Sequence, residues 1–217
     1  MNKIDYIIRP ENSKDFRAVE EMARETFWNL SVPGCTEHYF IHTMRSHPAF
    51  IPELDFVAEY QGRVIGCVMY TAAALIDEEG CEKPVLSMGP LCVHPDFQRQ
   101  GIGKALLEHT FALALEMGCD TVINFGNPDN YVARGYKSCK KFNVSLGGNF
   151  PAALLVKELV PGALSGRKWD YLPNDADAPC DDEEAVARFD ADFPPKEKAW
   201  QPSQEEFYIH CHSAITW

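Results

Sequence analysis

The residue types and spacing between Val93 and Leu107 could bind an anion. An apolar run ends at Pro95, a short polar loop with Gly101 and Gly103 follows, and an amphipathic helix begins directly after it. The N–H groups of a helix's first turn have no partner within the helix, and the helix dipole adds partial positive charge there. Glycine lets the backbone approach a phosphate closely. This order of strand, glycine loop and helix predicts a phosphate-binding loop.

The spacing of this loop excludes two common phosphate-binding motifs. The chain contains no Walker sequence, G-x-x-x-x-G-K-[ST], and a dinucleotide fingerprint needs a third glycine where Leu106 stands. The loop reads Gln98-x-x-Gly101-x-Gly103, which resembles the [QR]-x-x-G-x-[GA] signature of the GCN5-related N-acetyltransferases (GNAT). That signature holds the diphosphate of acetyl-CoA; the alternative is that the glycines only mark a turn. The resemblance implies cosubstrate contacts from Gln98, Arg99, Gln100, Gly101, Ile102, Gly103 and Lys104.

A second motif follows the next expected strand. Family members often carry [FY]-Y-x-x-x-G-[FY], and residues 130–136 match it except that Asn130 replaces the first aromatic residue. The preceding residues, 126–128, resemble the G-[DN]-P turn of one bacterial subset of the family. By this resemblance Tyr131 supplies a proton or hydrogen bond to the departing CoA thiolate. A tyrosine that merely packs within a helix is the alternative interpretation.

The resemblance also implies direct attack of a neutral amine on the thioester within a ternary complex. The strand Leu91-Cys92-Val93 then pairs with the pantetheine arm and supplies N–H groups to the oxyanion. Asn124, on the strand beside the thioester, can hydrogen-bond there but cannot act as a base. A lysine amine titrates near ~10.4, so a carboxylate or an ordered water usually helps to remove its proton.

The sequence does not identify the base. Glu59 lies late in a strand that could face the acceptor cleft. His94 titrates near neutrality but stands at the pyrophosphate end, so we interpret it as structural or adjacent to the cosubstrate. A covalent route through Cys92 is disfavoured because free cysteines are usually buried packing residues.

Composition argues against several classes of partner. The chain has 217 residues and a net charge of −12, whereas a nucleic-acid surface needs a basic patch. We find no apolar leader at the N-terminus and no run of the ~18 apolar residues that a membrane helix needs. The eight cysteines form no C-x-x-C pair, which favours free thiols in a reducing, cytoplasmic compartment and no bound metal.

The expected elements follow the order of the acetyltransferase fold, an α+β fold with a mixed, mostly antiparallel sheet flanked by helices. The resemblance covers residues 4–160, so we expect an N-acetyltransferase domain over residues 1–160 and a C-terminal extension over 161–217. A bulge or break is expected at Gly89-Pro90 because proline cannot donate to a strand ladder. Strands are expected at 4–9, 56–60, 63–76, 84–93, 121–125, 142–145 and 152–156, and helices at 13–27, 37–46, 100–117 and 128–134.

The extension is acidic but rich in aromatic residues. Its aromatic spacing predicts an ordered segment in which Trp169, Phe189 and Trp200 are protected from water. Asp181-x-x-Glu184 and Ser203-x-x-Glu206 resemble capping boxes at helix starts. Packing on the domain itself or on a second subunit, as a homodimer, both remain open. The acidic residues could attract a basic acceptor or simply confer solubility.

The sequence thus predicts an acetyl-CoA-dependent N-acetyltransferase (EC 2.3.1 class) that acts on a primary amine of a small molecule or a protein. A non-catalytic acyl-CoA-binding or interaction module is the main alternative. Transfer of a longer acyl group, or transfer to a hydroxyl group, is another. The identity of the acceptor does not follow from these residues.

Overall fold

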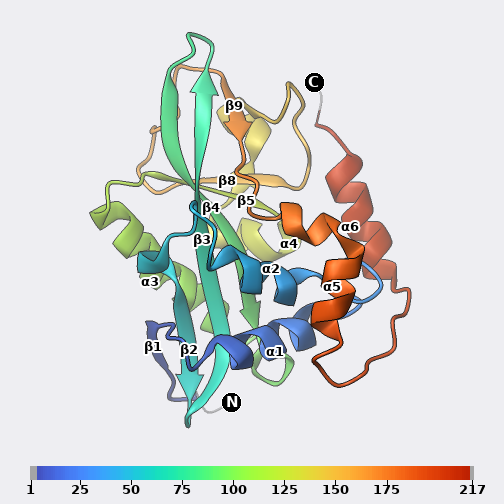
Figure 1. The fold of residues 1–217 in the computed structure, drawn as a ribbon. Coiled ribbons are helices and arrows are strands. Elements are labelled where there is room, and N and C mark those ends of the chain that lie inside the picture. Colours follow the sequence, from blue (N-terminus) through green and yellow to red (C-terminus); the bar gives the residue numbers. More distant parts are fainter. Residues whose placement is uncertain (1–3, 216–217) are drawn as a thin grey trace.

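The computed structural model describes residues 4–215, which form a central sheet with helices on both faces (Figure 1). Seven strands follow one another across the sheet in the order β1-β2-β3-β4-β5-β8-β6, and β9 pairs with β3 and with β7. Among the strands of residues 4–215, only the β4–β5 and β7–β9 pairs are parallel. The fold is therefore the mixed, mostly antiparallel α+β fold expected from the sequence. The strands are β1 (Ile7–Pro10), β2 (Phe56–Tyr60), β3 (Arg63–Asp77), β4 (Glu82–Val93), β5 (Thr121–Phe125), β6 (Lys137–Ser138), β7 (Val144–Ser145), β8 (Leu154–Glu158) and β9 (Trp169–Leu172).

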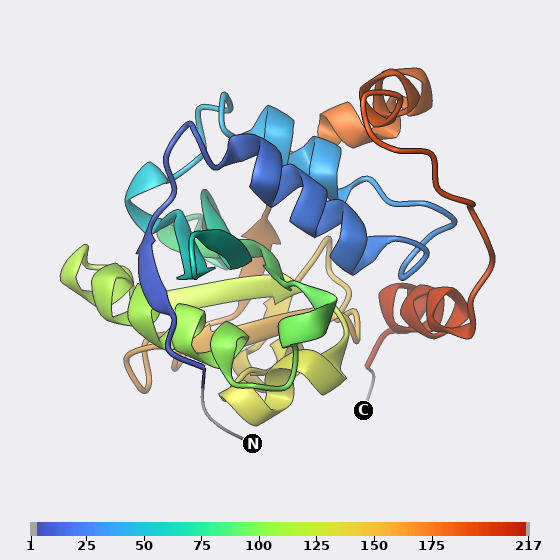
Figure 2. The same ribbon diagram turned by 90° about the horizontal axis from the view of Figure 1, so that it is seen from below.

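Two helices cover one face of the sheet and a third covers the other (Figure 2). In α1 (Phe16–Phe27), the spacing of Val19, Met22 and Ala23 places all three side chains in the core between α1 and the sheet. Helix α2 (Glu37–Met44) packs beside α1. On the opposite face, α3 (Ile102–Glu116) buries Leu106 and Leu107 against β2, β3 and β4. No helix within residues 4–215 is both long and apolar enough to cross a membrane.

The β4 strand contains the irregularity predicted at Gly89-Pro90. Val68 pairs with Leu91 and Tyr70 pairs with Met88, so Gly89 and Pro90 together stand opposite a single residue of β3. This is a bulge in β4. Beyond it, β4 no longer follows β5, because their parallel pairing is confined to Leu86↔Val122 and Ser87↔Ile123.

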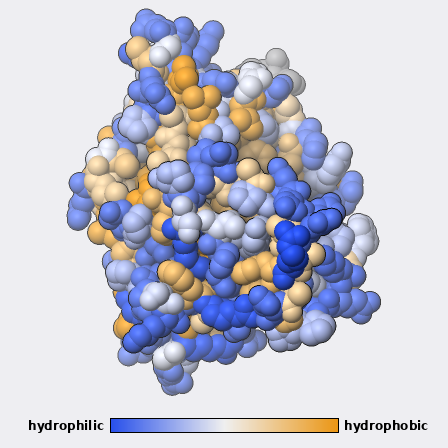
Figure 3. All heavy atoms as spheres, in the orientation of Figure 1, coloured by the Kyte–Doolittle hydropathy of each residue, from blue (hydrophilic) through white to orange (hydrophobic). Residues whose placement is uncertain are grey.

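Residues after 160 contribute a strand to the sheet and two helices beside it. Strand β9 pairs antiparallel with the outer part of β3, and α5 (Glu183–Asp190) contacts α2. Helix α6 (Pro202–His212) approaches the end of α1 at its start and residues 150–153 at its end. Figure 3 shows that hydrophilic residues dominate the face with α1, α2 and α5, while apolar residues gather around the β3–β4 hairpin.

Three expectations for this segment have different outcomes. Trp169 is buried, as predicted, and Phe189 is half-buried. The prediction for Trp200 is wrong, since 67% of this residue is exposed on the link between α5 and α6. The capping residues also differ: Asp182 caps α5, one position after Asp181, and Ser203 does not cap α6 but donates a hydrogen bond to the carbonyl of Leu30.

Candidate active site

A cavity of about 550 Å³ opens where β4 and β5 separate. Residues of both strands form its floor, and α1, α2, α6 and the segment after β9 form its walls. Three of the site residues expected from the sequence line it together: Leu91, Asn124 and Tyr131. The volume lies within the range of about 300–1,000 Å³ typical of small-molecule sites.

The edge of β4 continues from this cavity toward the glycine loop. From Met88 to Val93, β4 has β3 on one side and no strand on the other among residues 4–215. Leu91 and Val93 direct their side chains toward the core beneath α3, whereas the Cys92 side chain enters the core beneath α1 and α2. A bound chain could therefore pair with the backbone here, as strands do.

The glycine loop begins helix α3 as the sequence predicted. Gly101 is the N-cap with φ of +87°, a left-handed conformation that suits glycine, and Arg99 also has a positive φ of 61°. The first helical hydrogen bond is donated by the Ala105 N–H to the Gly101 carbonyl. The amides of residues 102–104 precede that bond and form the helix's free N-terminal turn. The Gln98 side chain ties the loop to β4 by donating to the Val93 carbonyl at 3.0 Å.

Gly103 lies where the glycine loop approaches the edge of β4. A Cβ atom built at this position would lie 3.6 Å from Val93 Cγ2 and 3.9 Å from Leu91 Cδ2, both ordinary contact distances. The protein interior therefore does not require a glycine here. Residues 92–104 do not line the cavity itself, but they extend from it along β4 and into α3. The other predicted side chains point elsewhere: Gln100 donates to the Asp96 carbonyl and Lys104 pairs with Glu108 on the surface.

Tyr131 is positioned by the turn that precedes it. Asn127 caps α4 (Pro128–Tyr131) by accepting a hydrogen bond from the Asp129 N–H at 3.0 Å. A Cβ atom at Gly126 would come within 2.9 Å of Tyr131 Cε2, so only glycine lets the tyrosine ring lie against this backbone. Burial raises the pKa of Tyr131, and the nearby side chain of Asn124 partly offsets this effect. The phenol therefore keeps its proton at neutral pH and can donate it.

Asn124 has an unused hydrogen-bond donor at the cavity. The residue is only 4% exposed, and its side chain contacts the Tyr131 hydroxyl. Its Nδ2 atom is buried without a hydrogen-bond partner in the described structure. Buried donors are nearly always satisfied, so an unpaired one that lines a cavity is available to an acceptor atom of a ligand.

Three residues considered from the sequence lie away from the cavity. The prediction that Glu59 could face the acceptor is wrong: its carboxylate pairs with Arg9 Nε at 2.7 Å, across the β1–β2 pair. His94 caps a short turn by accepting the Asp96 N–H, which agrees with a structural role. The Cys92 thiol is buried 3.3 Å from the sulfur of Cys67, outside the cavity.

Sequence reasoning missed several residues that line the cavity. Glu37, the first residue of α2, contributes a half-buried carboxylate, and burial raises its pKa. An acidic residue at a helix start is usually explained by the helix dipole, so its type and position gave no indication of this role. Tyr171, Asp177 and Phe207 come from the segment after residue 160, and nothing in their local sequence shows that they line the same cavity as Glu37.

The fold and the arrangement of strand edge, glycine loop and cavity define the class of acyl-CoA N-acyltransferases. The family described as Acetyltransferase (GNAT) matches residues 19–138, more than half of the chain. The chain belongs to this family.

Comparisons with individual proteins agree. The chain is 30% identical over 89 residues to the uncharacterized N-acetyltransferase YjhQ of Escherichia coli K12, a match that covers 41% of this chain and about half, 48%, of that relative. The structure of the GNAT family N-acetyltransferase YhbS from Escherichia coli in complex with CoA is similar with a TM-score of 0.68 and 22% identity, covering 80% of this chain and 92% of that one. A GNAT family acetyltransferase from Brucella melitensis in complex with acetyl-CoA has a TM-score of 0.61 and 21% identity, covering 79% and 97%.

Proposed function

We propose that this protein transfers the acetyl group of acetyl-CoA to the amine of an acceptor bound in the same cavity. The observation that carries the proposal is the meeting of the free β4 edge, the unpaired Asn124 amide and the Tyr131 hydroxyl at one cavity. Both solved relatives named above were determined with CoA or acetyl-CoA, which supports the choice of cosubstrate.

The cosubstrate would lie along β4, from the glycine loop to the cavity. The free N–H groups at the start of α3 suit its diphosphate, which carries the negative charge that a helix N-terminus favours. The backbone from Leu91 to Val93 suits the amide-containing pantetheine arm. The thioester would then reach the cavity beside Asn124 and Tyr131.

In the proposed reaction a neutral amine attacks the thioester carbonyl. A C–N bond forms, the C–S bond breaks, and the amine nitrogen loses its proton. Backbone N–H groups of the bulged strand can stabilise the negative oxygen. Tyr131 gives its proton to the departing thiolate, a step for which the raised pKa of the phenol keeps it protonated. Glu37 is the acidic side chain placed to receive the proton of the amine, directly or through a water.

The test is the formation of acetylated product. The purified protein is incubated with isotopically labelled acetyl-CoA and a panel of primary amines, and products are identified by mass spectrometry. Direct detection of product avoids interference from accessible cysteines such as the exposed Cys81, which would react in a thiol-release assay. Acetylation of at least one amine, with saturation in both substrates, supports the proposal. Tight CoA binding with no labelled product across the panel would show a binding module instead.

A further inference from the structure

We infer that the acceptor is a small monoamine with an apolar, preferably aromatic, body and no carboxylate, and that Glu37 binds its ammonium group. This inference rests on the proposed function and names the acceptor class for the same cavity. Three observations carry it: the charges on the cavity wall, the absence of an ion-pair partner for Glu37 among residues 4–215, and the aromatic rings that line the same cavity.

The ionisable side chains of the wall favour a cation. Its two carboxylates come from Glu37, which is half-buried, and Asp177, which is exposed at the rim. None of the described residues that line the cavity is lysine, arginine or histidine. A ligand carboxylate would therefore meet two negative groups and no positive partner, and desolvating it there would be costly. An ammonium group would instead be attracted by both negative groups and repelled by no positive one.

The Glu37 side chain is held in place by a hydrogen bond, but no positively charged side chain pairs with it among residues 4–215. One of its carboxylate oxygens accepts the Thr36 N–H at 3.0 Å, which fixes the side chain at the start of α2. Within residues 4–215 no cationic side chain forms an ion pair with it. Elsewhere in the protein, buried acids such as Glu11 and Glu20 are paired with Arg45. The half-buried carboxylate of Glu37 has no such partner, and a bound ammonium group would supply one.

The rest of the wall suits an apolar body. Aromatic side chains on the wall come from the ends of α1 and β5, from α2 and α4, and from the extension. Cation–π contact with an ammonium group adds to the effect of their apolar surface. The wall also contains the apolar side chains of Leu30 and Leu146. The aromatic residues are Phe27, Phe40, Phe125, Tyr131, Tyr171 and Phe207.

The segment after residue 160 closes the acceptor side of the cavity. Tyr171 is buried in β9, and its hydroxyl lies close to Ser87 of β4, near the bulge. Phe207 and Ser203 come from α6, which Ser203 ties to the Leu30 carbonyl at 2.8 Å. The cavity of about 550 Å³ would hold the acyl end of the cosubstrate together with the acceptor, and this volume suits a small molecule.

The first test compares acceptors that differ in one group. 2-Phenylethylamine and phenylalanine share an aromatic body and a primary amine, and only phenylalanine has a carboxylate. 1,4-Diaminobutane replaces the apolar body with a second charge, and a short lysine peptide represents a protein acceptor. We expect kcat/KM for 2-phenylethylamine to exceed that for each of the other three by at least tenfold. Equal or better use of phenylalanine, the diamine or the peptide would overturn the inference and leave the proposed function intact.

The second test removes the charge of Glu37 without changing its shape. Glu37→Gln should raise the KM for 2-phenylethylamine at least tenfold, leave the affinity for CoA unchanged, and reduce the preference over phenylalanine. Glu183→Gln, an exposed change on α5 with the same loss of charge, should do none of this. A folding defect would alter CoA affinity as well, so unchanged CoA binding separates the two explanations. Unchanged amine KM and unchanged preference in Glu37→Gln would refute the role of Glu37.

Discussion

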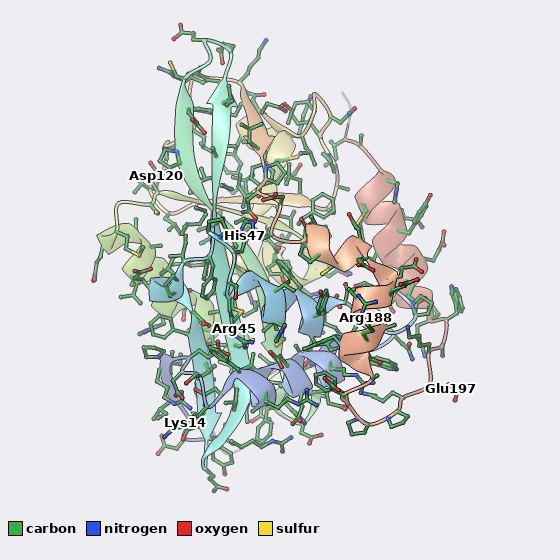
Figure 4. The ribbon with its side chains drawn as sticks, viewed as in Figure 1. Lys14, Arg45, His47, Asp120, Arg188 and Glu197 are labelled. Carbon is green, nitrogen blue, oxygen red and sulfur yellow. The ribbon has the colours of Figure 1, made fainter. Side chains whose placement is uncertain are left out.

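Arg24 and Asp190 form an ion pair that ties the C-terminal segment to the first helix. Arg24 Nε donates to Asp190 Oδ1 at 2.6 Å, although 166 residues separate them in the sequence. Arg24 is only 3% exposed and also lies over the Trp28 ring, 4.3 Å from its centroid. His38 Nε2 approaches the same carboxylate at 3.1 Å. The link after α5, around Glu197 in Figure 4, adds two hydrogen bonds from Trp28 and Asn29 to the Glu197 carbonyl.

Removing the carboxylate of this pair should destabilise the protein. Asp190→Ala leaves the buried guanidinium of Arg24 without its partner, and hydrogen bonds to charged groups contribute about 1.5–3 kcal/mol. We expect a loss of that order in the free energy of unfolding, measured by denaturant titration, together with faster proteolysis after residue 160. Glu184→Gln is the control, since Glu184 is exposed and pairs only within its helix. Equal stability of Asp190→Ala and wild type would show that the pair does not hold the segment.

A buried carboxyl near the N-terminus should give stability an unusual pH dependence. Asp55 is buried against Glu11, whose carboxylate pairs with Arg45 beside α1 and α2 (Figure 4). Burial, followed by the hydrogen bond with Glu11, raises the pKa of Asp55 to about 9. In the unfolded chain this carboxyl titrates near ~3.9, so between these values the native state binds more protons. This group therefore lowers stability as pH rises from about 4 toward 9.

Asp55→Asn removes this titration and keeps a hydrogen-bond donor toward Glu11. The variant should gain stability relative to wild type as pH rises, by at least about 1 kcal/mol between pH 5 and pH 8, measured by denaturant titration. Glu53→Gln, which removes an exposed carboxyl two residues away, controls for the loss of one charge. A difference between Asp55→Asn and wild type that stays constant over this pH range would contradict the prediction.

The sequence predicted local features well because they depend on adjacent residues. The left-handed Gly101 before α3, the bulge at Gly89-Pro90 and the turn before Tyr131 all follow from glycine, proline and motif spacing over a few positions. The cavity wall that faces the proposed acceptor could not be predicted in this way. Glu37 and Phe207 line one cavity because α6 returns to the end of α1, and such long-range arrangements leave no pattern in one sequence.

Two wrong expectations have physical reasons of the same kind. Glu59 was considered as a base because it lies on a strand, but alternation along a strand does not show which end of the sheet faces the ligand. The aromatic spacing of the extension predicts that Trp200 is protected from water, yet Trp200 lies in a link between two helices that is held by hydrogen bonds such as the one from the Ala199 N–H to Asn29 Oδ1.

Placing an acidic side chain at Gly103 should weaken binding of CoA. A Cβ atom fits at this position without a close contact, so Gly103→Asp should fold. Its carboxylate would stand in the first turn of α3, where the proposed diphosphate binds, and would repel it. We expect at least a tenfold loss of CoA affinity by calorimetry, with an unaltered melting temperature. Gly103→Ala controls for added bulk and should lose much less. Unchanged affinity for CoA in a folded Gly103→Asp variant would show that the diphosphate binds elsewhere.

Tyr131→Phe should slow the chemical step without affecting cosubstrate binding. The substitution keeps the ring packed against Gly126 and Tyr136 and removes only the hydroxyl. General acid catalysis typically contributes about 10²–10⁴-fold, so kcat should fall within that range while CoA affinity stays nearly constant. The loss should shrink with an acetyl thioester of a more acidic thiol, because a better leaving group needs less help from a proton donor.

Gly126→Ala provides an independent test of the same tyrosine. The added methyl group would come within 2.9 Å of the Tyr131 ring and displace it while the hydroxyl remains. This variant should therefore reduce kcat as Tyr131→Phe does, and the double variant should lose little more than either single one, since both act through the same proton transfer. If kcat stays at the wild-type value in Tyr131→Phe, measured where chemistry limits the rate, the thiolate takes its proton from water. Fully additive losses would mean that Gly126 acts by another route.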